Sequence, residues 1–248
     1  MFFRRCGILF IALVLAAGCA SEVIEPLVTV EAPTRPAVLQ VGLSDSLSAF
    51  EPIFYECATD IGVLVETLPW RMLRNQPKDV FVVYGEGGKV LTEQVYQIGT
   101  SPLVMIVHPD NPVNAFSQND LLRMYQGEIT DWRDLSPLSS YGGEMAVWGY
   151  MPGSELQDAF AEEIFTANLQ GAWNVAPDPA ALVDQVAQDA LAAGFVPVWA
   201  VTSSVRVVPL VDLTFEALPL LAIWEQMPDA AQQAWLVCVQ SELPQAEE

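Results

Sequence analysis

Hydrophobic positions along the chain follow two periods, one typical of strands and the other of helices. Short apolar runs predict strands at 37–42, 62–68, 79–84, 103–107, 144–150, 195–201, 205–211 and 218–224. Apolar residues at three- and four-residue spacing predict helices at 47–61, 118–126, 156–165, 180–192 and from 229 onward. Because strands alternate with helices, the expected fold class is α/β with mostly parallel sheets.

The clearest local signals lie in the stretch 97–135, QIGTSPLVMIVHPDNPVNAFSQNDLLRMYQGEITDWRDL. Its apolar run is long enough for a buried strand, and the Pro-Asp-Asn-Pro segment that follows stops it. Ser117 and Asp120 have the spacing of a capping box, and Gly127 stands where the helix is expected to end. On pattern alone, the stretch fits a β-turn-α unit of any α/β protein.

The residue identities in this stretch are more specific than its hydrophobic pattern. PLVMIVHPDNPV, a capped helix and then GEITDWRDL resemble the periplasmic binding protein (PBP) superfamily, and within it the phosphate-binding proteins that serve ABC transporters. Ile129, Thr130 and Trp132 stand in the I-T-x-W turn of that family. The resemblance is good over this stretch and fainter from about Ala37 to the C-terminus.

The resemblance implies a two-lobe α/β fold of the type 2 PBP-like class. Each lobe is expected to hold a mostly parallel sheet flanked by helices, with a ligand cleft between the lobes. The second lobe of such proteins is inserted within the first. The implied lobes are therefore 37–101 plus 201–248 and 102–200, with the crossover near Pro102–Pro109.

The N-terminal sequence predicts an export signal followed by a lipid anchor. A basic start and a short apolar run precede Leu15-Ala16-Ala17-Gly18-Cys19, which resembles the lipobox of bacterial lipoproteins. Residues 1–18 are then a signal peptide, Cys19 receives the lipid, and 19–36 form a tether rich in Pro, Glu and Thr. The expected location is the cell membrane, facing the extracytoplasmic side. The alternative is an ordinary secretory signal with an incidental cysteine.

Two cysteines remain once the signal and the lipidated residue are set aside. Cys6 leaves with the signal, so Cys57 and Cys238 form an even pair in an exported protein, and we predict a disulfide between them. The alternative is two buried free thiols. No spacing suits a structural zinc site, and we predict no metal and no cofactor.

The charge balance excludes one class of partner. The chain has 10 Lys+Arg and 31 Asp+Glu, for a net charge of −21, and loss of Arg4 and Arg5 with the signal leaves 8 against 31, or −23. Such a surface argues against nucleic acid. The single histidine, His108, lacks an evident catalytic partner and reads as a hinge-strand residue, so we predict no enzyme.

The resemblance also implies where a ligand would bind. Phosphate-binding relatives hold the oxyanion in a serine-rich loop after the first strand, a step after a later strand, and a Gly-Ser loop of the second lobe. The implied ligand-binding residues are Ser44, Asp45, Ser46, Tyr84, Gly85, Tyr150, Gly153, Ser154 and Glu155.

Two departures weaken a phosphate site. Glu155 replaces a small glycine, and the upstream arginine of the family is missing from Trp148-Gly149-Tyr150. A carboxylate 4 Å from an anion costs roughly 4 kcal/mol at intermediate dielectric. We therefore do not expect tight phosphate binding, but a cleft for a small solute with aromatic walls from Tyr84, Trp148 and Tyr150.

Two functions fit these expectations. The first is a monomeric, lipid-anchored substrate-binding protein that delivers a small solute, phosphate or another oxyanion by resemblance, to an ABC permease. The second is a transport-inactive lipoprotein of the same fold that acts as a sensor or a protein-interaction scaffold. The missing arginine and Glu155 favour the second.

Overall fold

The computed structural model describes residues 38–85, 94–135, 141–164, 171 and 173–245, within one compact unit at 36–248. The expected signal peptide, Cys19 and the tether lie outside the described residues.

Nine strands and six α-helices make up the described part of the chain. The strands are β1 Val38–Ser44, β2 Gly62–Leu68, β3 Val80–Tyr84, β4 Gln94–Val107, β5 Ala146–Gly149, β6 Asn174–Val175, β7 Ala192–Pro197, β8 Arg206–Val208 and β9 Ala217–Trp224. The α-helices are α1 Glu51–Glu56, α2 Trp70–Leu73, α3 Gln118–Tyr125, α4 Glu155–Ile164, α5 Pro179–Gln188 and α6 Ala230–Glu242. Short 3-10 turns are η1 Asp45–Phe50, η2 Trp132–Asp134 and η3 Val198–Ala200.

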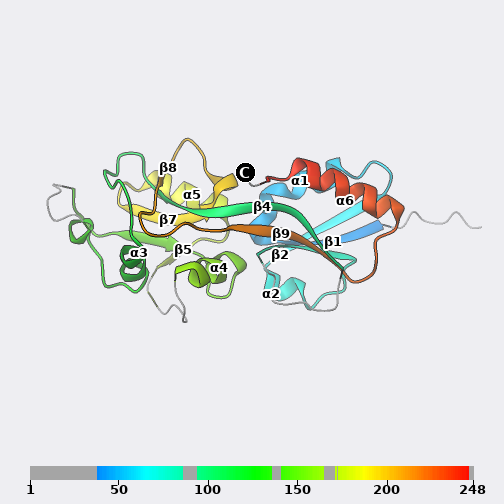
Figure 1. The fold of residues 1–248 in the computed structure, drawn as a ribbon, viewed down its shortest axis with the longest axis horizontal. Helices are drawn as coiled ribbons and strands as arrows, with labels where there is room; N and C mark the ends of the chain where they lie inside the picture. Colours follow the sequence, from blue (N-terminus) through cyan, green and yellow to red (C-terminus); the bar gives the residue numbers. More distant parts are fainter. Residues whose placement is uncertain (1–37, 86–93, 136–140, 165–170, 172, 246–248) are drawn as a thin grey trace, which may run out of the picture. The chain divides into compact units, whose positions relative to one another are not determined.

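The long strand β4 joins two groups of strands. The strand order is β2-β1-β3-β9-β4-β7-β5-β6, with β8 also on β4. Strand β4 pairs with β9 as far as Pro102 and with β7 from Leu103 onward. We call β1, β2, β3, β9, η1, α1, α2, α6 and the first part of β4 the first lobe. The rest of β4, β5 to β8 and α3 to α5 form the second lobe (Figure 1).

Both lobes combine parallel and antiparallel pairs, as an α/β fold with crossover helices allows. Strand β1 is parallel to β2 and β3, and β5 is parallel to β6 and β7. The antiparallel pairs among the described strands all involve β4 or β9. The α/β class is confirmed, and the two long strands supply its antiparallel part. The implied lobe boundary at 101/102 lies one residue before the point where β4 changes partner. Strand β8 pairs with the second part of β4, whereas the implied division counts residues from 201 onward in the first lobe, so the full division stays a prediction.

Local sequence signals explain helix α3. The Ser117 hydroxyl accepts from the Asp120 N–H, and the Asp120 carboxylate accepts from the Ser117 N–H, which is the predicted capping box. Gly127 follows the helix at φ 73°, a conformation that glycine adopts without steric cost. The capped helix in the stretch 97–135 is therefore confirmed.

Two predicted helices differ from the structure. Residues 47–61 do not form one helix, because the 3-10 turn η1 precedes α1, and α1 ends at Glu56, next to the disulfide-bonded Cys57. Helix α5 ends at Gln188, and Gly194 lies inside β7 instead of ending the helix. A Cβ at Gly194 would meet Leu182 of α5 at 2.7 Å, so this glycine allows close helix–strand packing.

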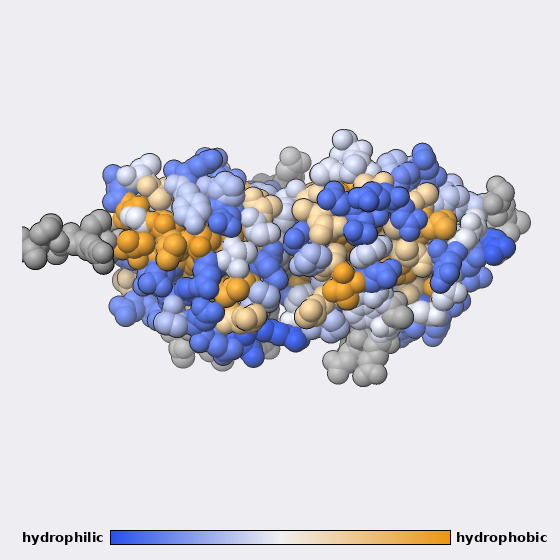
Figure 2. All heavy atoms as spheres, turned by 180° about the vertical axis from the view of Figure 1, so that it is seen from behind, coloured by the Kyte–Doolittle hydropathy of each residue, from blue (hydrophilic) through white to orange (hydrophobic). Residues whose placement is uncertain are grey.

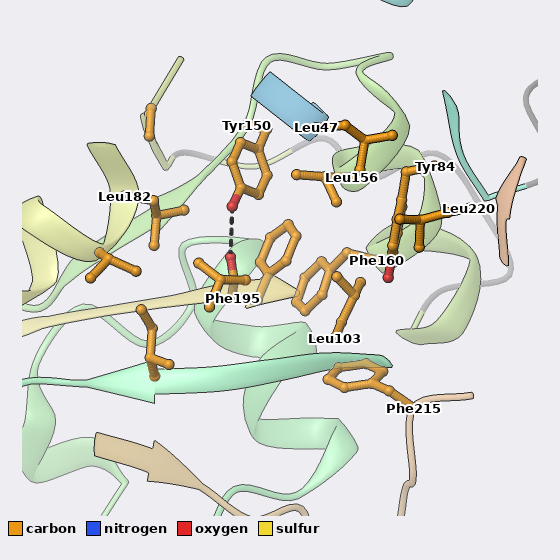
Figure 3. Close-up of a cluster of buried hydrophobic side chains, with 14 of the residues drawn as sticks. Leu47, Tyr84, Leu103, Tyr150, Leu156, Phe160, Leu182, Phe195, Phe215 and Leu220 are labelled. Atoms are coloured by element: carbon orange, nitrogen blue, oxygen red, sulfur yellow. Dashed lines mark hydrogen bonds between the residues drawn. The ribbon is translucent and has the colours of Figure 1, made fainter. Parts of the chain in front are cut away.

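A large hydrophobic cluster extends through both lobes, and a small second cluster of Leu73, Phe81, Val83 and Ile223 lies in the first lobe. In the second lobe, the rings of Phe160 and Phe195 stack with centroids 3.8 Å apart. Figure 3 shows Leu47, Tyr84 and Leu220 of the first lobe beside this pair. The lobes therefore pack against each other through apolar side chains as well as through β4.

The described part of the chain also carries surface and covalent features. Cys57 and Cys238 form a disulfide, which is the pairing that the sequence predicts. Figure 2 shows hydrophilic residues over much of one face, with hydrophobic residues gathered most densely over the first lobe. No helix within the described ranges combines the length and the apolar character needed to cross a membrane.

Candidate ligand-binding site

Three hydrogen-bond donors meet where β1 and β3 end. Ser44 is the last residue of β1, Ser46 follows in η1, and Tyr84 is the last residue of β3. Because β1 and β3 are parallel neighbours, their carboxyl ends lie at the same edge, which is where α/β sheets bind ligands. The parallel pairing of β1 and β3 therefore brings Ser44, Ser46 and Tyr84 together.

The carboxylate of Glu155 lies among these donors. The hydroxyls of Ser44 and Ser46 both donate to its Oε2, the latter at 2.7 Å, and the Tyr84 N–H donates to its Oε1 at 3.1 Å. Glu155 is the first residue of α4 in the second lobe, whereas the donors belong to the first. We call Ser44, Ser46 and the Tyr84 N–H the donor cradle.

Burial sets the protonation behaviour of Glu155. Glu155 is only 9% exposed, and this burial raises the pKa of its carboxyl group from 4.5 to about 7. The bonds from Ser44, Ser46 and the Tyr84 N–H act in the opposite direction and lower the pKa. The neighbouring Asp45 carboxylate adds to the rise, and burial raises the pKa of Asp45 as well.

A second contact joins the lobes at the loop that precedes α4. Arg71 of α2 donates from Nε to the carbonyl of Gly153 at 2.8 Å and from Nη2 to that of Pro152 at 2.7 Å. Gly153 has φ 77°, and a Cβ there would lie 1.1 Å from Nη2 of Arg71. A side chain at this position would have to displace the guanidinium and adopt a backbone conformation that favours glycine.

Arg71 is a site residue that the sequence analysis missed. The expected arginine was sought in the second lobe, whereas the structure brings one from the first. One signal was available, because Arg71 comes three residues after the end of a predicted strand in a chain that has few basic residues. Its hydrogen-bond partners could not be predicted, because they are backbone carbonyls, which every residue has.

A cavity of about 250 Å³ opens beside Glu155. Its lining includes Asp45, Trp70, Arg71, Tyr150, Glu155 and Pro177. Residues of both lobes therefore face one space, whose walls are mainly apolar and include the charged residues Asp45, Arg71 and Glu155. Such a space suits a small organic solute better than a bare inorganic ion.

The remaining expected site residues are mostly engaged with the protein. The phenols of Tyr84 and Tyr150 donate to the carbonyls of Ser101 at 2.7 Å and Phe195 at 3.2 Å, the latter visible in Figure 3. The Gly85 N–H donates to the Pro219 carbonyl at 2.8 Å.

Of the aromatic residues that were expected to form walls, Tyr150 lines the cavity. Tyr84 contributes its backbone N–H to the cradle, and Trp148 is not part of this lining. Gly153 and Ser154 do line the cavity, and the Ser154 N–H donates to the Met151 carbonyl at 2.9 Å. In the part of the chain that the structure covers, no group of three His, Cys, Asp or Glu residues could hold a metal ion.

Comparison with known proteins places this geometry in context. A family model described as a PBP superfamily domain matches residues 84–218. A search of curated proteins found no match.

Solved structures share the fold at low sequence identity. A phosphate ABC transporter substrate-binding protein from Clostridium perfringens, solved with bound phosphate, is 17% identical with a TM-score of 0.67, covering 83% of this chain and 94% of that one. An ABC-type phosphate transport receptor from Vibrio cholerae is 18% identical with a TM-score of 0.58, at 82% and 94% coverage. The reduced OxyR regulatory domain from Pseudomonas aeruginosa is 14% identical with a TM-score of 0.57, at 83% and 98% coverage.

Proposed function

Because the chain belongs to the family of PBP superfamily domains, we propose that it is a lipid-anchored solute-binding protein that works with an ABC-type permease. Family membership supports a solute-binding role. The permease, the lipid anchor and the kind of solute are parts of the proposal. The transport receptors from Clostridium perfringens and Vibrio cholerae, which share the fold, support the pairing with a permease.

The observation that carries this proposal is the cavity between the lobes. Asp45 and Arg71 of the first lobe and Tyr150 of the second line the same space of about 250 Å³. Two lobes that enclose a ligand can report its presence by closing, which is what a permease reads in such systems. A small solute with an apolar body fits the mainly apolar walls.

The anchor follows from the N-terminal signal. Lipidation at Cys19, after removal of residues 1–18, would hold the domain at the extracytoplasmic face of the membrane. Residues 19–36 would act as the tether, and the domain would work as a monomer. Globomycin, which blocks lipoprotein signal cleavage, should leave a larger precursor in cells, and a Cys19→Ala variant should lose the lipid mass.

Native mass spectrometry of the protein purified from its source tests solute binding directly. The expected result is an adduct of a small organic mass, which is lost after partial unfolding and refolding. Replacing Trp70 with Ala should weaken rebinding, because Trp70 is one of the residues that line the cavity. A protein that carries no adduct and binds no solute from a metabolite extract would contradict the proposal.

A second function is favoured by one specific observation. The donor cradle is occupied by Glu155 of the same chain, so the lobes are joined without a solute. A sensor or interaction scaffold that has lost transport could have this arrangement, and the fold is shared with an OxyR regulatory domain. Small-angle scattering separates the two, because a transport protein should become more compact with its solute, whereas a scaffold should not.

A further inference from the structure

The donor cradle has the chemistry of an oxyanion site. Two hydroxyls and one backbone N–H, all buried, converge on the two oxygens of one carboxylate. A phosphate or sulfate presents pairs of oxygens to donors in a similar way. The group in the cradle is therefore a carboxylate that stands where two oxygens of a free oxyanion could be held.

Helix capping does not account for the two serines. Ser44 precedes η1, yet its side chain makes no capping bond to that turn. The hydroxyls of Ser44 and Ser46 lie 3.0 Å apart, and both donate to Glu155. Their orientation thus serves the carboxylate from the other lobe.

Glu155 and the loop just before it both form hydrogen bonds with the first lobe. The Glu155 carboxylate accepts hydrogen bonds from the donor cradle of the first lobe. The carbonyls of Pro152 and Gly153, just before it, accept from Arg71 of the first lobe. A group held in this way is at a high effective concentration at the cradle, which a free anion must overcome. A charged carboxylate would also repel an incoming anion at close range.

We propose that Glu155 is a built-in occupant of a latent oxyanion site, which excludes free phosphate and similar anions from the cradle and keeps the lobes joined without them. Glu155 thus determines which solutes are excluded from the donor cradle. This inference rests on the proposed function for its setting at the solute cavity, although phosphate exclusion can be measured whether or not the natural solute is known.

Titration calorimetry with inorganic phosphate, in a buffer without other oxyanions, tests the proposal. We expect no saturable binding to the wild type or to Glu162→Ala, a matched control at an exposed glutamate of the same helix. Glu155→Ala should bind phosphate, and adding Ser46→Ala should weaken that binding about tenfold through loss of one donor to a charged acceptor. Circular dichroism would establish that each variant is folded.

Glu155→Ser provides a second variant if the alanine variant fails to fold, because its polar side chain suits a site lined by hydroxyls and a backbone N–H better than a methyl group does. It too should gain phosphate binding. Wild type that binds phosphate as tightly as the variants would overturn the proposal, as would folded Glu155 variants that bind none. A wild type that carries no organic solute would count against the proposed function and leave these phosphate results unaffected.

Discussion

Two serine–carboxylate clusters in this protein use the same chemistry at different ranges. In the capping box of α3, Asp120 accepts from the Ser117 hydroxyl at 2.7 Å and from the Ser117 N–H at 2.9 Å. In the donor cradle, Glu155 accepts from the hydroxyl of Ser46 at 2.7 Å and from the Tyr84 N–H at 3.1 Å. The first cluster joins residues three apart, and the second joins residues 109 and 71 apart.

The difference in range decides what each cluster does. The capping box satisfies the first N–H groups of its own helix, and its residues are half-buried. The cradle brings two lobes together and buries its carboxylate, which raises the pKa of Glu155 to about 7. The same groups therefore act as a local folding signal in one place and as a tertiary contact in the other.

The longest-range contact should have the largest effect on stability. The disulfide joins Cys57 and Cys238 across 181 residues, and its removal frees the unfolded chain. We expect a Cys57→Ala/Cys238→Ala variant to lose about 2–5 kcal/mol of the free energy of unfolding. Urea denaturation with and without reductant measures this loss, and reductant should have no effect on the double variant.

A pH effect should distinguish the cradle from the capping box. The pKa of Glu155 rises from 4.5 to about 7 on folding, so the folded chain holds this proton more tightly than the unfolded chain. The stability from this residue is full below about pH 4.5 and is lost as the pH rises through 7. The difference amounts to roughly 3 kcal/mol.

The measurement is the free energy of unfolding of wild type minus that of Glu155→Gln across this pH window. Glutamine does not titrate, and both proteins keep the neighbouring Asp45, so its contribution largely cancels. The difference should fall as the pH rises. Two parallel curves would show that the carboxylate does not titrate as its burial requires.

Much of the fold, and less of the site, could be predicted from the sequence. The apolar run, the Ser117 cap and Gly127 act within a few residues, so their pattern alone gave the strand and helix α3. The serines at the end of β1 could be placed because parallel strands end at one edge. The Glu155 contact could not be found in this way, because it depends on how one lobe packs against the other.

The partial errors have the same origin. Glu155 was expected to weaken an anion site by repulsion, but the position of its carboxylate among the cradle donors was not predicted. Gly194 was expected to end a helix, whereas its small size serves a contact with Leu182 of α5. In both cases the residue type was noted correctly, but its partner lies outside any local window.

Two glycines with positive φ allow the Arg71 contact to be measured. Gly153 and Gly127 have φ 77° and 73°, but only Gly153 has a neighbour within 4 Å of a built Cβ, the guanidinium of Arg71. Gly127→Ala should cost about 1 kcal/mol from backbone strain alone. Gly153→Ala should cost about 1–3 kcal/mol, because it also displaces Arg71. Equal losses in thermal unfolding would show that Arg71 moves aside at no cost.

The smallest effect compares one serine from each cluster. Ser117→Ala and Ser46→Ala each remove a hydroxyl that bonds to a carboxylate, and each should lower the free energy of unfolding by about 1 kcal/mol. Only Ser46→Ala should raise the pKa of Glu155 further, because its hydroxyl stabilises the charged carboxylate. Carbon-13 NMR of labelled glutamate side chains, titrated through neutral pH, would detect that shift. A rise of the same size in Ser117→Ala would mean that the two clusters are coupled through the core, and the contrast between a local and a long-range cluster would then not hold.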